Sequence, residues 1–293
     1  MKSIPSSFCS TTRAAAFLCV FSTLRARRSL IALTGVLWTM LGGAWVGVYA
    51  QTANFDGARA QSVIANAANN GLGSPRAVAV DGSGNVYIAD WGNSQVLKET
   101  LSAGSYSQSV VANAATNGLF QPEGVAVDGS GNVYIADTNN NRVLKETLTA
   151  GSYTQSVVAN RDDNGVFGPN GVAVDGSGNV YIADSRNSRV LKETLSAGSY
   201  TQSVVADSAN GGLNFPQGVS VDGSGNVYIA DTYSFRVLKE TLSAGSYTQS
   251  VVANSADNGL GSFYDVAVDG SGNVYIADCS NNRVLKETLS SGS

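Results

Sequence analysis

The chain has 293 residues, of which 14% are charged, and it contains 33 glycines and no histidine. The absence of histidine removes the most common general base and the most common metal ligand of enzymes. Residues 51–293 hold thirteen basic and 22 acidic side chains, and such an acidic body repels phosphate backbones, which argues against nucleic acid as a partner.

Residues 1–50 have the pattern of a signal peptide. Arginines at positions 25, 27 and 28 precede an apolar run at 30–50, which ends in small residues of the kind that signal peptidase reads. We therefore predict cleavage after Ala50, a short linker over 51–58, and a protein that is secreted or lies in the periplasm or cell envelope. Two alternatives stay open: the run is long enough to act as an uncleaved signal anchor, and the arginine pair faintly resembles a twin-arginine export signal.

Two of the three cysteines, Cys9 and Cys19, lie in this predicted signal segment. Only Cys279 remains in the body, so no internal disulfide is expected there and the fold must be stabilised by packing. Because no histidine is present to activate it, we interpret Cys279 as a tolerated small residue and not as a nucleophile.

One eleven-residue stretch, VDGSGNVYIAD, occurs five times at intervals of 47 residues, beginning at positions 80, 127, 174, 221 and 268. The unit that starts at Gly124 contains four short runs typical of strands: GVAV, NVYIA, VLKETL and YTQSVVAN. Glycine-containing or polar turns separate these runs, which predicts a four-stranded antiparallel meander. Stacking five such sheets buries both faces of each, so the sequence predicts an all-β, five-bladed β-propeller over residues 59–293.

The ends of the repeat region are in phase with each other. The chain ends after the third strand of its fifth unit, and residues 59–66, RAQSVIAN, align with the fourth-strand sequence YTQSVVAN at 247–254. We therefore predict a monomeric ring that is closed by pairing of residues 59–66 with residues 282–289, which would leave no exposed sheet edge between the termini.

The pattern GVAVDGSGNVYIADTNNNRVLK at 124–145 resembles the NHL repeat, and the resemblance covers all five units. It implies a β-propeller that serves mostly as a binding platform, often on secreted proteins or receptor ectodomains. NHL propellers commonly have six blades, whereas this chain supplies five, and the unit here is longer than usual. Some related propellers are lactonases or lyases, and the zinc lyases use histidine ligands that this sequence lacks, so the fold alone does not define the function.

Several acidic and basic positions recur in every unit. The first aspartate of DGSGN is interpreted as a turn residue and not as a calcium ligand, because each loop offers one carboxylate where calcium needs six to eight oxygens. A second aspartate stands five residues before a glutamine or arginine and is expected to pair with it across a turn, most weakly in the first copy. The Lys98-Glu99 pair and its copies are expected on a solvated outer strand. The first set of aspartates is Asp81, Asp128, Asp175, Asp222 and Asp269. The second set is Asp90, Asp137, Asp184, Asp231 and Asp278. The partners of the second set, in the same order, are Gln95, Arg142, Arg189, Arg236 and Arg283.

Comparison of the five copies separates two kinds of loop. The loops between strands one and two and between strands three and four are almost invariant, whereas the loops on the opposite side of a meander differ from copy to copy. Aromatic residues and arginine on loops held by a rigid scaffold are typical of binding interfaces. We predict binding of an extracellular or cell-envelope protein or glycan, without catalysis, metal or cofactor, through Trp91, Arg186, Tyr233, Phe235 and Tyr264, together with Arg76, Glu123, Asn170 and Gln217 at the entries of the innermost strands.

Two other functions remain open at this point. A metal-dependent, lactonase-like hydrolase could use Glu123 and Asn170 at the channel mouth around a divalent ion. A purely structural, self-associating role is suggested by the near-identity of the repeats. Contact with a membrane is expected only if the signal segment is not cleaved.

Overall fold

The computed structural model describes the backbone of residues 36–41, 44–49 and 62–288, and the side chains of residues 62–288. Strands β1 (Val36–Leu41) and β2 (Ala44–Tyr49) pair antiparallel, within the predicted signal segment. The predicted cleavage position after Ala50 and the linker 51–58 lie outside the described residues. Among the described residues, no helix has the length and apolar character needed to span a bilayer.

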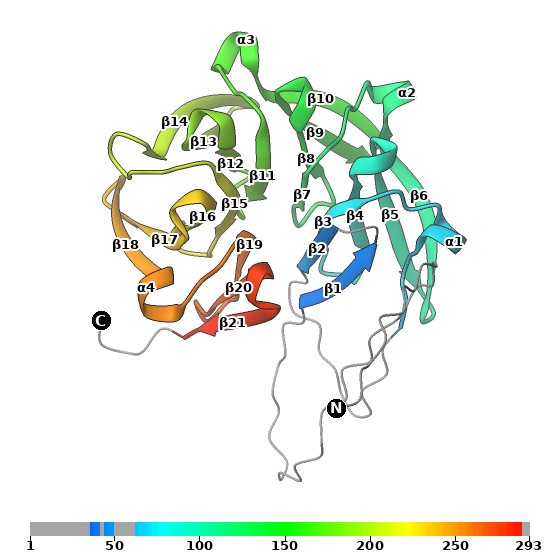
Figure 1. The fold of residues 1–293 in the computed structure, drawn as a ribbon. Helices are drawn as coiled ribbons and strands as arrows, with labels where there is room; N and C mark the ends of the chain where they lie inside the picture. The colour runs from blue at the N-terminus through cyan, green and yellow to red at the C-terminus, as the bar shows by residue number, and fades with distance from the viewer. Residues whose placement is uncertain (1–35, 42–43, 50–61, 289–293) are drawn as a thin grey trace, which may run out of the picture. The chain divides into compact units, whose positions relative to one another are not determined.

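Five antiparallel sheets follow along the chain, one for each 47-residue unit (Figure 1). Each of the first four has four strands in sequence order, and the fifth has three in the described part of the chain. The strands are β3 (Pro75–Val80), β4 (Val86–Asp90), β5 (Gln95–Ser102) and β6 (Ser105–Asn113) in blade one; β7 (Gly124–Val127), β8 (Val133–Asp137), β9 (Arg142–Thr149) and β10 (Ser152–Asn160) in blade two; β11 (Pro169–Val174), β12 (Val180–Asp184), β13 (Arg189–Ser196) and β14 (Ser199–Asp207) in blade three; β15 (Pro216–Val221), β16 (Val227–Asp231), β17 (Arg236–Ser243) and β18 (Ser246–Asn254) in blade four; and β19 (Phe263–Val268), β20 (Val274–Asp278) and β21 (Arg283–Glu287) in blade five.

Short helical turns connect these strands. A one-turn 3-10 helix follows the second strand of every blade, at Trp91–Asn93, Thr138–Asn140, Ser185–Asn187, Thr232–Ser234 and Cys279–Asn281. Four-residue helices, α1 (Ala67–Asn70), α2 (Ala114–Asn117), α3 (Arg161–Asn164) and α4 (Ser255–Asn258), lie in the linkers that enter the next blade.

The first strands of successive blades, β3, β7, β11, β15 and β19, each contact the next one, which arranges the blades around a common axis (Figure 1). The five-bladed, all-β propeller predicted from the repeat is therefore confirmed. In this structure β2 lies against β3 and also contacts β19.

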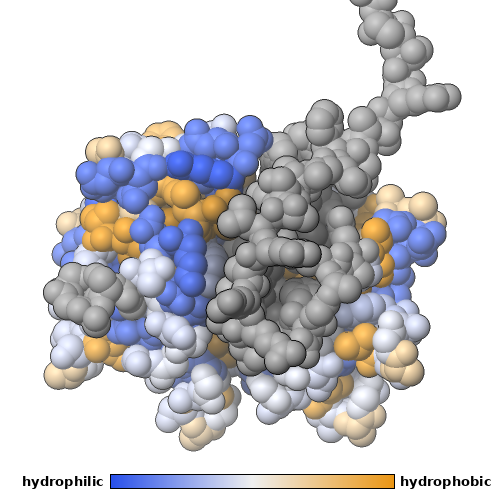
Figure 2. Space-filling view, turned by 90° about the horizontal axis from the view of Figure 1, so that it is seen from below, coloured by the Kyte–Doolittle hydropathy of each residue, from blue (hydrophilic) through white to orange (hydrophobic). Residues whose placement is uncertain are grey.

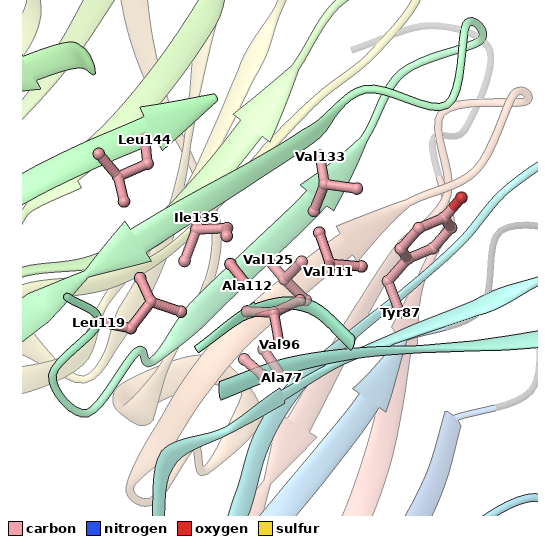
Figure 3. Close-up of a cluster of buried hydrophobic side chains, with 11 residues drawn as sticks. Ala77, Tyr87, Val96, Val111, Ala112, Leu119, Val125, Val133, Ile135 and Leu144 are labelled. Atoms are coloured by element: carbon pink, nitrogen blue, oxygen red, sulfur yellow. The ribbon is translucent and has the colours of Figure 1, made fainter. Parts of the chain in front are cut away.

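The core lies between the blades. All five residues of the second strand, VYIAD, are buried in each of the first four blades, as expected for a strand covered on both faces. Figure 3 shows the interface of blades one and two, where Ala77 and Val96 of blade one pack near Val125, Val133 and Ile135 of blade two. Equivalent clusters join the later blades, so the repeat sequence produces one interface again and again.

A column of small residues allows the innermost strands to approach closely. A Cβ atom on Gly171 would lie 2.5 Å from the carbonyl oxygen of Gln217 in the next blade, and Gly124 and Gly218 are crowded in the same way by Asn170 and Asp265. Glycine is therefore required at this position in blades two to four. The first and last blades differ, because Ala77 and Asp265 occupy the equivalent positions.

The structure corrects the prediction that the lysine and glutamate of the third strand are both solvated. The glutamates of the first four blades are almost completely buried, with at most 3% of the residue exposed: Glu99, Glu146, Glu193 and Glu240. Asn70 and Asn117, in the linkers that enter blades one and two, donate hydrogen bonds to Glu99 and Glu146 at 3.1 and 3.0 Å. Each lysine, by contrast, lies over a tyrosine ring of the second strand, as Lys98 does over Tyr87 at 5.3 Å.

The outer surface is mixed in polarity. The outermost strands expose one valine each, with about half of the residue accessible: Val110, Val157, Val204 and Val251. Figure 2 shows that on the side seen from below, hydrophobic residues form small patches among hydrophilic ones. Isolated apolar residues of this kind are normal on protein surfaces.

Blade five lacks a fourth strand among the described residues. Residues 59–61 of the predicted closing strand lie outside the described residues, and residues 62–66 have no strand conformation in this structure. Val284 in β21 is 42% exposed, whereas its equivalent Val237 in blade four is fully buried. Ile64 and Ala65 nevertheless pack against the core of blade one, as Val111 and Ala112 pack against that of blade two. Closure of the ring by residues 59–66 stays a prediction.

Candidate binding face of the propeller

The side of the ring that carries the invariant loops is fixed by an internal hydrogen-bond network. In the first copy, Oδ1 of Asp81 accepts hydrogen bonds from the backbone N–H groups of Ser83 and Asn85, at 2.9 and 3.0 Å. Oδ2 accepts from the side chains of Asn85 and Tyr87, at 2.7 and 3.1 Å. Partial burial on its own would raise the pKa of Asp81, but these hydrogen bonds outweigh it and lower that pKa. The predicted role as a turn residue is confirmed, and the same bonds recur in all five copies.

The variable side is held by a second repeated network. Oδ1 of the fully buried Asp137 accepts from the backbone N–H of Phe120 at 2.8 Å, and Oδ2 accepts from Nε of Arg142 at 2.7 Å. The same guanidinium donates to the carbonyls of Asn117 and Gly118 in the linker. The predicted Asp–Arg pairing is confirmed in blades two to five. Because this network joins the 3-10 turn to the linker, the variable loops are held by a rigid scaffold.

The first blade has a reduced version of this network. Gln95 donates one hydrogen bond to Oδ2 of Asp90, at 3.0 Å, and makes none of the linker contacts that arginine makes in the other copies. Asn93 supplies a bond from this turn to the carbonyl of Gly71, at 2.7 Å. This agrees with the expectation that the first copy is the weakest.

On the variable side, two arginines that were predicted as binding residues lie on aromatic rings. The guanidinium carbon of Arg76 is 4.9 Å from the ring centroid of Trp91. That of Arg186 is 5.1 Å from the centroid of Phe167, and Arg161 lies over the same ring at 4.6 Å. Trp91 is half-buried, whereas the three arginines are exposed, so each ring supports a guanidinium that faces solvent.

Blades four and five contribute aromatic residues. The rings of Phe215 and Tyr233 are stacked, with centroids 4.9 Å apart and an interplanar angle of 16°. Tyr233, Phe235 and Tyr264 are among the most exposed large hydrophobic residues, with 57%, 43% and 48% of the residue accessible. Phe120, 51% exposed, is a further aromatic residue of this side that the sequence analysis missed.

Two acidic residues lie near the axis at the entries of the innermost strands. Burial raises the pKa of Glu123, and the guanidinium groups of Arg76 and Arg186 oppose that rise. Asp265, which replaces the glycine of the repeat, accepts a single hydrogen bond from the described residues, from the backbone N–H of Val266 at 2.8 Å, and burial raises its pKa to about 7. Asp265 was not among the predicted site residues, although aspartate in place of the glycine of the other copies is visible in the sequence.

Two other predicted binding residues, Asn170 and Gln217, also take part in backbone packing between blades. Asn170 and Gln217 are half-buried, and the carbonyl of each lies against the glycine of the preceding blade, Gly124 or Gly171. Their side-chain type is therefore not dictated by this contact, which uses only the backbone.

Cys279 is half-buried, and burial raises the pKa of its thiol to about 11, in keeping with an unreactive cysteine. The described residues contain no group of three or more cysteine, aspartate or glutamate side chains placed to hold a metal ion.

The fold and its repeated networks define a β-propeller, and comparison with known proteins identifies the repeat. The model of the NHL repeat matches at residues 72–98, 121–145, 168–192, 213–239 and 265–286, once in every blade. The protein is an NHL-repeat β-propeller. A search of curated proteins found no match.

Solved structures share this fold at low sequence identity. Propellers in a nidogen/laminin complex (21% identity, 71% of this chain and 73% of that chain, TM-score 0.58) and in virginiamycin B lyase from Staphylococcus aureus (12% identity, 76% and 72%, TM-score 0.54) are similar. A gluconolactonase from Xanthomonas campestris matches at 14% identity over 75% of this chain and 76% of that chain, with a TM-score of 0.53. These likenesses concern the fold, because the neighbours include both a protein complex and enzymes.

Proposed function

We propose that this protein is an exported, non-catalytic binding scaffold that engages an extracellular or cell-envelope protein or glycan through the variable side of the ring. The observation that carries the proposal is the contrast between the two sides. On one side, Asp81 and its four copies make the same turn in every blade, and on the other, the residues that break the repeat are exposed aromatics and arginines. Mechanically equivalent loops have no packing reason to differ in this way.

Export is proposed from the basic and apolar pattern of residues 1–50. The base under the variable loops supports binding, because buried aspartates such as Asp137 and Asp184 fix the linkers and the 3-10 turns to each other. A rigid base lowers the entropy that a loop loses when it binds a partner. The neighbour in the nidogen/laminin complex shows that a propeller of this shape can occur in a protein assembly.

The test is capture of a partner from a native cell-envelope extract. Alanine at Trp91, Arg186, Tyr233, Phe235 and Tyr264 should abolish capture and leave the melting temperature nearly unchanged, because these side chains lie outside the interblade cores. The matched control changes the opposite side, at Ser83 and its copies, and should retain capture. Loss of capture only in the control would show that the partner uses the invariant side.

A second candidate, a lactonase-like hydrolase at the channel mouth, is favoured by one observation. Glu123 and Asp265 are two acids near the axis whose pKa values are raised by burial. Perturbed carboxyl groups are common in active sites, although structural networks also produce them. Hydrolysis of lactones that depends on an added divalent ion, and that is lost in Glu123→Gln, would support this candidate over the binding scaffold.

A further inference from the structure

The three arginines on aromatic rings differ from every other basic residue of the described chain. Between residues 62 and 288, five lysines each lie over a tyrosine of the repeat, and four arginines are paired with buried aspartates. Arg76, Arg161 and Arg186 are the remaining three, and none of them forms an ion pair with another described residue. Each of them also stands where the other copies carry a different residue, since Arg161, for example, is alanine or serine elsewhere.

Arg76 and Arg186 belong to blades one and three, and both are near enough to Glu123 in blade two to influence its pKa. Both guanidinium groups act on the carboxyl of Glu123 in blade two, which lies between them in the ring. Arg161 and Arg186 share the ring of Phe167, so two like charges lie close together, and neither forms an ion pair with a carboxylate of the described residues. This local group of positive charges favours an incoming anion, even though residues 51–293 as a whole carry a net negative charge.

The position of Arg186 is fixed by packing. Its backbone N–H donates to the carbonyl of Phe167 at 3.2 Å, and its aliphatic stem lies so close to Gly168 that a Cβ atom there would approach Cδ to 2.7 Å. The side chain of Arg186 therefore lies between the backbone at Gly168 and the ring of Phe167. A planar, pre-placed guanidinium binds carboxylates through two parallel hydrogen bonds, which a lysine cannot imitate.

The backbone on this side is already occupied. Asp90 accepts the N–H groups of Gly73 and Ser74, and the buried aspartate of each later blade accepts one linker N–H, as Asp184 does from Phe167 at 2.7 Å. An extended peptide is bound mainly through main-chain hydrogen bonds at an open strand edge, whereas these linker N–H groups already donate to aspartates. This favours recognition through guanidinium groups and ring faces.

We propose that the variable side binds an acidic glycan, through uronic acid carboxylates on Arg76, Arg161 and Arg186 and through sugar rings on the exposed aromatics of blades four and five. The Tyr233 ring, held flat against Phe215, offers a planar apolar surface of the kind on which the C–H face of a pyranose stacks. A chain of uronic acids supplies both a carboxylate and a ring face in every unit. This inference rests on the proposed binding function and names its ligand class.

The test measures binding of the full chain to a defined oligouronate by calorimetry, with the same oligosaccharide after reduction of its carboxyl groups as the paired ligand. We expect binding of the acidic form only. Arg76→Gln and Arg186→Gln should each weaken affinity at least tenfold, and Arg186→Lys should weaken it nearly as much, because the charge alone does not replace the two-pronged contact. The charge-matched control Lys98→Gln, which changes a lysine on the outer part of a blade, should stay within about twofold of the unaltered protein, since exposed charges beyond a Debye length contribute little.

Equal binding of the reduced oligosaccharide, or unchanged affinity in both arginine-to-glutamine variants, would overturn the proposal. Tighter binding of a polyglutamate peptide than of the oligouronate at the same salt concentration would overturn it in favour of an acidic protein partner. If the envelope partner is captured through the variable side but no oligouronate binds, the ligand class is wrong and the binding function stands. If the oligouronate is shortened during incubation, the non-catalytic function itself is wrong.

Discussion

Nε of Arg189 lies 2.6 Å from Oδ2 of Asp184, and the carboxylate is completely buried while the arginine is about one quarter exposed. The pair sits at the start of the third strand of blade three, and the same guanidinium also donates to the linker carbonyls of Asn164 and Gly165. Arg189 therefore pairs with the buried charge of Asp184 and also holds, by hydrogen bonds, the linker that comes from the preceding blade.

The first blade provides a natural test of this arrangement, because Gln95 stands where the others have arginine. We predict that Gln95→Arg stabilises the protein by about 1 kcal/mol, since it adds charge-assisted hydrogen bonds to a buried carboxylate and to the linker. The reverse change, Arg189→Gln, should cost about 1 to 3 kcal/mol. Urea unfolding of both variants measures the effect. An unchanged free energy of unfolding in both variants would show that the guanidinium does not stabilise the fold.

The buried glutamates predict a dependence of stability on pH. Burial raises the pKa of Glu193 to about 7 from the ordinary 4.5, and in this structure neither carboxylate oxygen has a hydrogen-bond partner. Between these two values the unfolded chain is ionised while the folded chain holds a proton, so stability falls as pH rises from about 4.5 to about 7 and is constant above that. We expect Glu193→Gln to gain about 1 to 3 kcal/mol over the parent at pH 8.

That gain should disappear at about pH 3.5, well below the unfolded pKa of 4.5, where both states of the parent hold the proton at Glu193. Thermal unfolding at the two pH values gives the comparison, and Asp162→Asn, on an exposed side chain, is the charge-matched control. A gain of equal size at both pH values would show that the glutamine acts through packing and not through loss of the ionisable group. Part of the parent's pH dependence should survive, because the pKa of Glu146 is also raised to about 7.

Closure of the ring can be tested by a disulfide. In blade one, Val96 pairs with Ala112, and the repeat places Val284 opposite Ala65 in the same register. With the three native cysteines replaced by serine, Ala65→Cys with Val284→Cys should form an intramolecular disulfide on oxidation. The control pairs Ala65→Cys with Leu285→Cys, whose side chain points to the other face of the strand and should react poorly. A disulfide between two chains would show instead that the strand is exchanged between copies.

Export has a direct readout. We expect the mature protein to begin at Gln51, because cleavage after Ala50 removes the basic and apolar segment. Sequencing of the N-terminus of protein from the native cell measures this. An intact Met1 on membrane-bound material would establish the signal anchor in place of cleavage.

The strands and turns could be predicted because they depend on local sequence that recurs at a fixed interval. VYIAD predicts a buried strand wherever it stands, and the Asp–Arg spacing predicts a pair across a short turn. The burial of Glu146 could not be predicted from its own strand, since it depends on the side chain of Asn117 and on the neighbouring blade. The contact of Phe167 with two arginines was not predicted for the same reason, because those arginines come from two separate loops.

The glycine column has a consequence for how the number of blades can change. Blades two to four carry Gly124, Gly171 and Gly218, and each of these glycines allows the next blade to approach closely, whereas Ala77 and Asp265 stand at this position in blades one and five. A gene duplication that copied an internal unit would therefore insert one more compatible blade without any point mutation. Duplication of the last unit would instead place a second aspartate in the crowded column, so growth of the ring is permitted in its middle and resisted at its end.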